Sequence, residues 1–213
     1  MSVAEPSAHF ARRLAPKARL LAIASGKGGV GKTWLSITLA HAFARAGQRA
    51  LLFDGDLGLA NVDIQLGLMP TLDLAEVVAG RMTVGQAATT FEAGGFDVVA
   101  GRSGSASLAS LEPKLLRLLG RQLVEAASDY HWVIMDLGAG VESTVRHLTG
   151  PATTCLVLCT DEPTSLTDAY AFIKLSSRDN PELDARIVVN QAHSRREGER
   201  TYRTLLKACE SFL

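Results

Sequence analysis

The chain has 213 residues, and its 22 lysines and arginines are balanced by 22 aspartates and glutamates. This length fits one globular domain with a substantial core. The net charge of zero excludes a protein that binds nucleic acid or acidic membranes through its overall charge, since only a local patch could do so.

The cysteines and the hydropathy pattern indicate a cytoplasmic protein. Cys155, Cys159 and Cys209 are too few and too poorly spaced for a disulfide framework or a zinc site. Cys155 and Cys159 lie four residues apart, so in a strand they would share one face as buried thiols. The N-terminus lacks the apolar core of a signal peptide, and no apolar run approaches the ~20 residues of a spanning helix.

Short apolar segments alternate with helical patterns along the chain. Residues 1–18 are expected to form a tail or short arm, and residues 19–213 a single domain. The apolar segments do not alternate with polar residues, which predicts strands buried on both faces: 20–25, 50–54, 96–101, 132–136, 154–159 and 186–190. Helices are expected at 32–46, about 112–128 and about 165–177. This order predicts a three-layer α/β fold, with a mostly parallel sheet and helices on both faces.

A glycine-rich loop, "GKGGVGKT" at 26–33, lies between the first predicted strand and the first predicted helix. This is the context in which the P-loop pattern predicts a triphosphate site. Gly26 and Gly31 frame the loop, and its backbone N–H groups, with the helix N-terminus, would bind phosphates. Lys32 would reach the β- and γ-phosphates, and Thr33 would offer its hydroxyl to Mg²⁺.

The loop holds a second lysine, Lys27. The segment "KGGVGKT" resembles the deviant Walker A motif of the MinD/ParA ATPases. The resemblance implies that Lys27 reaches across an ATP-dependent homodimer to the partner's phosphates, where it would act like an arginine finger. The competing interpretation is a solvated loop lysine.

Carboxylates follow two further predicted strands. The segment at 51–68 is similar to the family's switch segment, which implies that Asp56 orients the attacking water and Asp54 assists the metal shell. "WVIMD" at 132–136 resembles a Walker B strand, so Asp136 would hold Mg²⁺ through water. The resemblance thus assigns catalysis to Lys27, Lys32 and Asp56, and Mg²⁺ to Thr33, Asp54 and Asp136. The predicted nucleotide contacts are Gly26, Lys27, Gly28, Gly29, Val30, Gly31, Lys32, Thr33, Trp34, Asn61 and Asn190.

ATP is favoured over GTP at the base site. The segment "VVNQAHS" at 188–194 has no N/T-K-x-D signature for guanine. Asn190 matches the family asparagine whose amide pairs with adenine, and Asn61 matches a switch asparagine on the nucleotide side of the dimer. The expected cofactors are therefore ATP and Mg²⁺.

Three segments resemble one branch of the family, the flagellar-number regulators of the FlhG (FleN) type. These are "GLANVD", the "GAG" after the Walker B strand, and "EPTSLTDAYAFIK" at 162–174. The resemblance implies slow ATP hydrolysis coupled to dimerisation, and control of flagellar number or placement. A cytoplasmic location is expected, with transient residence at the inner face of the membrane only if an element other than the family's membrane-targeting helix anchors the chain. The alternatives are a Min-type division-site ATPase, a ParA-type partition ATPase and an ATP-binding module without hydrolysis.

The chain departs from the family pattern in four places. Trp34 follows Thr33, where a small or polar residue is usual, and Asp161 replaces a proline. The N-terminal motif that engages the flagellar GTPase FlhF is not found, since residues 9–16 offer only a short apolar-basic segment. The chain ends before a further strand, a further helix and a membrane-targeting helix, so we expect these to be lacking.

Two segments near the C-terminus carry patterned charge. The segment 199–213 spaces apolar residues as one face of a helix, which fits a membrane-surface helix or, as the family position favours, a helix packed on the sheet. The arginines within 190–200 are Arg195, Arg196 and Arg200. They are interspersed with glutamates, so we expect a solvated loop there rather than a nucleic-acid patch.

Overall fold

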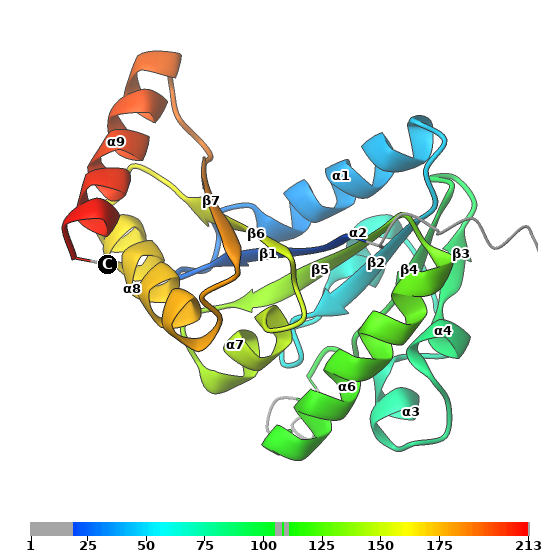
Figure 1. Cartoon of the computed structure of the whole chain (residues 1–213). Helices are drawn as coiled ribbons and strands as arrows, with labels where there is room; N and C mark the ends of the chain where they lie inside the picture. The colour runs from blue at the N-terminus through cyan, green and yellow to red at the C-terminus, as the bar shows by residue number, and fades with distance from the viewer. Residues whose placement is uncertain (1–18, 105–107, 109–110, 213) are drawn as a thin grey trace, which may run out of the picture.

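The structure, a computed structural model, describes residues 19–104, 108 and 111–212, so the predicted N-terminal arm lies outside it. A seven-stranded sheet runs through its centre in the order β3-β4-β2-β5-β1-β6-β7 (Figure 1). All neighbouring strands are parallel except β3 and β4. The strands are β1 (Arg19–Ser25), β2 (Ala50–Gly55), β3 (Thr89–Phe91), β4 (Phe96–Val99), β5 (Trp132–Ala139), β6 (Thr154–Cys159) and β7 (Asp184–Val189).

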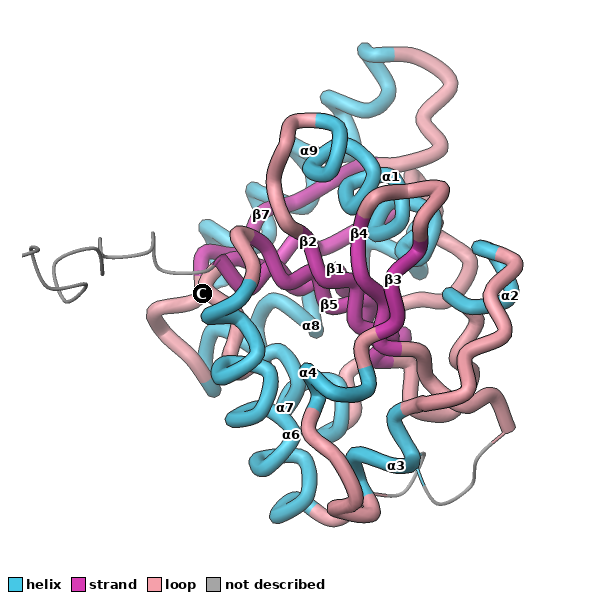
Figure 2. The backbone as a smooth tube through the Cα atoms, turned by 90° about the vertical axis from the view of Figure 1, so that its right-hand side faces the viewer, coloured by secondary structure: helices cyan, strands magenta, loops and turns pink. Residues whose placement is uncertain are grey.

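Helices cover both faces of the sheet, as the alternating pattern predicted. Helices α1 and α2 lie on one face, and α6, α7 and α8 lie on the other (Figures 1 and 2). The helices are α1 (Lys32–Arg45), α2 (Val62–Leu66), α3 (Leu74–Val78), α4 (Val84–Ala87), α6 (Pro113–Ala126), the 3-10 turn η1 (Ala127–Asp129), α7 (Ser143–Thr149), α8 (Pro163–Asp179) and α9 (Arg195–Phe212).

Strand β6 shows how the sequence produces two cores. Cys155 and Cys159 are fully buried in the cluster under α6 and α8, whereas Leu158 belongs to the cluster under α1. Alternate residues of a strand point to opposite faces, so an unbroken apolar run supplies both clusters. The prediction that the two thiols share a buried face is confirmed.

The edges of the sheet differ from the prediction. The expected strand at 96–101 ends at Val99, and the expected strand at 132–136 continues to Ala139. The pattern did not predict β3, a three-residue antiparallel edge strand. The other edge strand, β7, is only half-buried, so burial on both faces was wrong there, because β7 has a neighbour on one side only.

The basic segment at the C-terminus is helical. Helix α9 begins at Arg195, so the predicted loop is wrong beyond that residue. Ser194 starts the helix, since its hydroxyl accepts the N–H of Glu197 at 3.2 Å, and Arg195 pairs with Glu199 one turn on.

Helix α9 packs against α8 and β7. Leu205 of its apolar stripe is buried in the core, as the packing interpretation predicted, whereas Tyr202 and Phe212 of the same stripe are exposed. Within the residues that the structure describes, no helix is both long enough and apolar enough to cross a bilayer.

Candidate functional site

The sheet brings three of the predicted site segments to one edge. Strand β5 lies between β1 and β2, and Asp136 of β5 pairs in register with Ile23 of β1 and Asp54 of β2. The loop at 26–31 leaves the end of β1 at the same edge. Because parallel strands present their carboxyl ends together, the phosphate loop and the two carboxyl groups face a common space.

The backbone of the phosphate loop requires its glycines. Gly29 and Gly31 have φ angles of 77° and 95°, a region that favours glycine. A Cβ at Gly26 would lie 2.2 Å from the backbone of Asp168, so the loop packs directly on α8 at its first residue. A Cβ at Gly29 would meet nothing within 4 Å, so this part of the loop borders open space.

Lys32 is the first residue of α1 and is only 9% exposed. Burial lowers the pKa of its ammonium group, and the nearby carboxylates of Asp136 and Asp56 partly oppose that shift. A buried ammonium group held between carboxylates at a helix N-terminus can donate hydrogen bonds to phosphate oxygens with little competition from water.

Asp136 lies beside Thr33 and Ser36. Burial raises the pKa of the Asp136 carboxyl to about 6, although hydrogen bonds from Thr33 and Ser36 lower it. The Ser36 hydroxyl lies 3.0 Å from Asp136 Oδ1. Sequence reasoning missed Ser36; its position one helical turn after Lys32 was the available signal.

Asp54 holds the segment that carries Asp56 and Asn61. Its Oδ2 accepts the N–H groups of Asn61 and Val62, both at 3.0 Å, and its Oδ1 accepts that of Asp56 at 3.2 Å. Burial raises its pKa to about 7, against the lowering effect of these bonds. Gly101 closes over this carboxyl, since a Cβ there would lie 3.4 Å from Asp54 Cγ. Asp54 therefore anchors the switch segment.

Asp56 and Asn61 lie on that anchored segment. Asp56 Oδ1 accepts the N–H of Leu59 at 3.0 Å, and a Cβ at Gly138 would lie 3.6 Å from the Asp56 carboxyl. Asp56 thus lies against the end of β5, within electrostatic range of Lys32. Asn61 Oδ1 accepts a hydrogen bond from Gln65 at 3.2 Å, and Asn61 directly precedes α2, to which its side chain gives no capping hydrogen bond.

Lys27 points away from this buried centre, onto its own chain. Its Nζ forms an ion pair with Glu162 and donates to Thr164 Oγ1 at 3.1 Å. Both partners lie at the start of α8. The Lys27 and Glu162 side chains are 39% and 58% exposed. The bond is therefore readily exchanged for another partner.

The segment after β7 is bound to the phosphate loop. Asn190 Nδ2 donates to the carbonyl of Val30 at 2.8 Å, and Gln191 Nε2 donates to that of Gly29 at 3.1 Å. A Cβ at Gly31 would lie 2.5 Å from Asn190 Nδ2. Among the described residues, none donates a hydrogen bond to Asn190 Oδ1, so this oxygen can accept from a base.

Trp34 is 63% exposed, so it does not pack in the core. It occupies the first turn of α1, directly after Thr33. Sequence reasoning also missed Thr164 and Gln191; no local pattern links them to the loop, because both contacts cross more than 130 residues of chain.

The residues present fit a magnesium ion bound with a nucleotide. Thr33 and Asp136 supply a hydroxyl and a carboxylate beside the phosphate loop. The part of the chain that the structure describes has no cluster of three or more His, Cys, Asp or Glu suited to a metal. Mg²⁺ typically takes one or two protein oxygens and fills its shell with phosphate and water, which suits this sparse donor set.

Comparisons with known proteins show the family of the chain. The model of the CobQ/CobB/MinD/ParA nucleotide-binding domain matches residues 21–210. The antiactivator FleN of Pseudomonas aeruginosa is 39% identical over 195 residues, which are 92% of this chain and 69% of FleN. The flagellum site-determining protein YlxH of Helicobacter pylori is 29% identical over 213 residues, which are 99% of this chain and 70% of YlxH.

The fold also matches solved structures. The septum site-determining protein MinD of Pyrococcus horikoshii, complexed with Mg-ADP, aligns with a TM-score of 0.76 at 21% identity, covering 88% of this chain and 77% of that one. At this identity the likeness shows the fold. Together with the complete phosphate loop, the family match shows that the chain belongs to the CobQ/CobB/MinD/ParA family, as an ATP-binding P-loop ATPase of the MinD/ParA type.

Proposed function

We propose that the protein hydrolyses ATP slowly, in a homodimer that forms with ATP, and that this cycle regulates the number or placement of flagella. One observation carries the proposal: a complete phosphate loop lies beside the buried Lys32 and Asp136, with Thr33 hydrogen-bonded to Asp136. The flagellar output is supported by the similarity to FleN and YlxH.

Each part of the site has a task in this proposal. The amides of residues 26–33 bind the phosphates, and Lys32 neutralises charge on the β- and γ-phosphates. Thr33 and Asp136 would hold Mg²⁺, which when bound supplies charge neutralisation across the same phosphates. Asp56 orients the attacking water, and Asp54 keeps Asp56 in place through the three backbone bonds it accepts. A direct role of Asp54 in the metal shell remains a prediction.

The nucleoside is expected between the loop and the segment after β7. Asn190 Oδ1 can accept a hydrogen bond from the adenine amino group while Nδ2 stays on Val30. Trp34 lies one helical turn beyond Gly31, which itself packs on Asn190, and these two observations support a contact between its exposed ring and the bound nucleotide. Asn61 would contact the nucleotide from the switch segment.

The partner in this cycle is a second copy of the chain. Lys27 would leave Glu162 and Thr164 and bind the phosphates held by the partner, so that the active arrangement exists only in the dimer. We propose a cytoplasmic protein that visits the membrane transiently, and flagellar assembly proteins, including FlhF, as further partners.

Light scattering would test the dimer directly. Molar mass is measured with Mg²⁺-ATP, with Mg²⁺-ADP and without nucleotide, using Asp56→Ala to suppress hydrolysis. We expect a dimer only with ATP, and a weaker one when Lys27→Ala is added. Phosphate release by the wild type should fall roughly 100-fold in Asp56→Ala, the usual scale for losing a water-orienting group.

Three outcomes would refute parts of this proposal. A monomer at saturating ATP would exclude the dimer cycle for this chain. Bound ATP without phosphate release would leave a nucleotide-binding module. Salt-sensitive, ATP-dependent DNA binding would instead favour a partition ATPase.

A further inference from the structure

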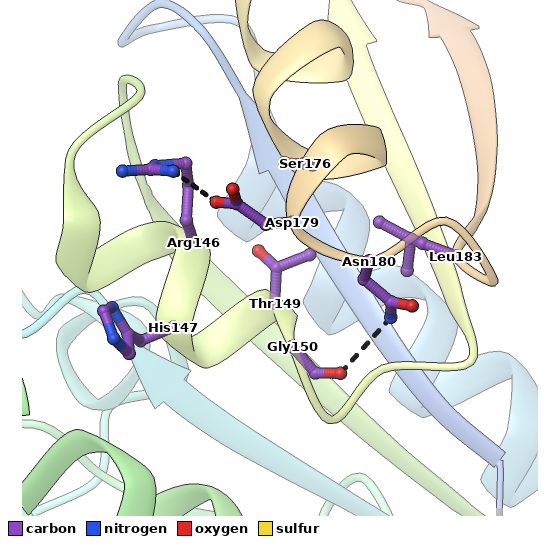
Figure 3. Close-up of a pocket in the computed structure, with 8 residues that line it drawn as sticks. All are labelled: Arg146, His147, Thr149, Gly150, Ser176, Asp179, Asn180 and Leu183. Atoms are coloured by element: carbon purple, nitrogen blue, oxygen red, sulfur yellow. Dashed lines mark hydrogen bonds and ion pairs between the residues drawn. The ribbon is translucent and has the colours of Figure 1, made fainter. Parts of the chain in front are cut away.

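Two cavities meet at the end of α7, at the sheet edge opposite the phosphate loop. One, of about 400 Å³, lies between the ends of α7 and α8 (Figure 3). The other, of about 420 Å³, lies between α6 and the end of α7. His147 and Gly150 line both, so the two form one continuous depression, which we call the α6–α8 groove.

The α6 half of the groove is apolar. Leu116, Gly120 and Val124 line it from α6, and Pro151 lines it from the segment after α7. A Cβ at Gly120 would lie 3.0 Å from Pro151 Cγ, so the glycine leaves this wall without a side chain. Val124 is 51% exposed. Val124 therefore contributes little to the hydrophobic core, and packing of the core does not explain why this position is apolar.

The α8 half of the groove is polar. Arg146 forms an ion pair with Asp179 across it (Figure 3) and also donates to the carbonyl of Val141 at 3.2 Å. Asp179 lies 3.5 Å from a second arginine, Arg178. An incoming carboxylate can therefore share Arg146 while Asp179 keeps Arg178 as its partner.

The surroundings of the groove carry an excess of positive charge. Arg117 and Arg121 of α6 line the groove, and neither forms an ion pair with any residue that the structure describes. With Arg146 they make three arginines among the lining residues, against two acids, Glu125 and Asp179. The lining of the groove therefore carries a net charge of +1, in a chain whose net charge is zero.

We propose that the α6–α8 groove docks an acidic, amphipathic segment of a partner protein. An apolar side chain of that segment enters the α6 half, beside Val124, and a neighbouring carboxylate binds Arg146 or Arg121. A nucleic-acid backbone would satisfy the arginines and leave the apolar half unfilled, so a peptide fits better. The groove lies at the sheet edge opposite the phosphate loop.

A peptide-display library of random 12-residue sequences, selected on the whole protein with Mg²⁺-ADP, would test this site. We expect enrichment of peptides in which a large apolar residue lies within four positions of Asp or Glu. Fluorescence polarisation then measures a labelled peptide against variants. Val124→Glu and Arg121→Glu should each weaken binding at least tenfold.

Matched variants on α9 serve as controls. Phe212→Glu and Arg203→Glu make the same kinds of change at exposed positions outside the groove, and should change the affinity less than twofold. Circular dichroism checks that each variant is folded. No enrichment, enrichment of basic peptides, or equal losses in groove and control variants would each overturn the proposal.

Discussion

The two lysines of the phosphate loop lie five residues apart in very different surroundings. Lys32 is buried, and its charge is set against Asp136 and Asp56. Lys27 is half-exposed and bound to Glu162 and Thr164 at the start of α8. The strands of the sheet therefore fix the surroundings of Lys32, whereas Lys27 is held by contacts that cost little to break.

The different surroundings of the two lysines suit them to different tasks, Lys32 to binding the nucleotide and Lys27 to changing partners during the cycle. Groups held by β1, β2 and β5 cannot move without disturbing the core, so they suit the phosphates and the metal ion, which need a preformed site. A side chain held by one exposed ion pair can change partners as the nucleotide changes. Substitution of Lys32 should therefore abolish ATP binding, whereas substitution of Lys27 or Glu162 should shift the equilibrium between monomer and dimer.

The largest effect is expected from Lys32→Ala. Removing the buried cation that we propose to bind phosphate should lower ATP affinity by roughly 100-fold or more, because charge-assisted bonds of this kind are strong and water cannot replace them. Isothermal titration with Mg²⁺-ATP measures the loss, and Lys207→Ala on α9 serves as the control. A loss below tenfold would show that the backbone amides alone hold the phosphates.

The buried carboxyls should make stability depend on pH. Burial raises the pKa of Asp54 to about 7 and that of Asp136 to about 6, so the folded chain binds these protons more tightly than the unfolded chain. Stability of the nucleotide-free protein should therefore rise as pH falls from 8 to 6, by about 1–2 kcal/mol, or roughly 3–6 °C in Tm.

Calorimetry of variants isolates the two groups. Asp136→Asn should flatten part of the rise between pH 8 and 6, whereas Asp63→Asn in the first turn of α2 should leave it unchanged. A Tm that falls over this range in the wild type would mean that other groups dominate. Saturating Mg²⁺-ATP should reduce the rise, because bound cations favour the ionised carboxylate.

The sequence predicted the centre of the molecule better than its periphery. The phosphate loop, Asp54 and Asp136 were predictable because unbroken apolar runs mark buried parallel strands, and the residues after such strands gather at one edge. The start of α9 was not, because arginines and glutamates suit both a loop and a helix, and the cap at Ser194 decides. The partners of Lys27, Glu162 and Thr164, could not be predicted from the sequence either, because they depend on how α8 packs on the phosphate loop.

The smallest predicted effect is also the sharpest test of the comparison. Glu162→Gln removes the charge that holds Lys27, and an exposed ion pair is worth about 0–1 kcal/mol, so dimer formation with ATP should strengthen by at most about fivefold for each of the two lysines released. Glu199→Gln, which breaks a similar exposed pair on α9, should have no effect.

Sedimentation equilibrium in the Asp56→Ala background would measure the change produced by Glu162→Gln. The gain must disappear when Lys27→Ala is added, because Glu162 then has no lysine to release. A dimer that weakens in Glu162→Gln would place this carboxylate in the dimer contact itself. The ion pair between Lys27 and Glu162 would then stabilise the dimer rather than compete with it. Lys27 would in that case be part of a preformed site, as Lys32 is.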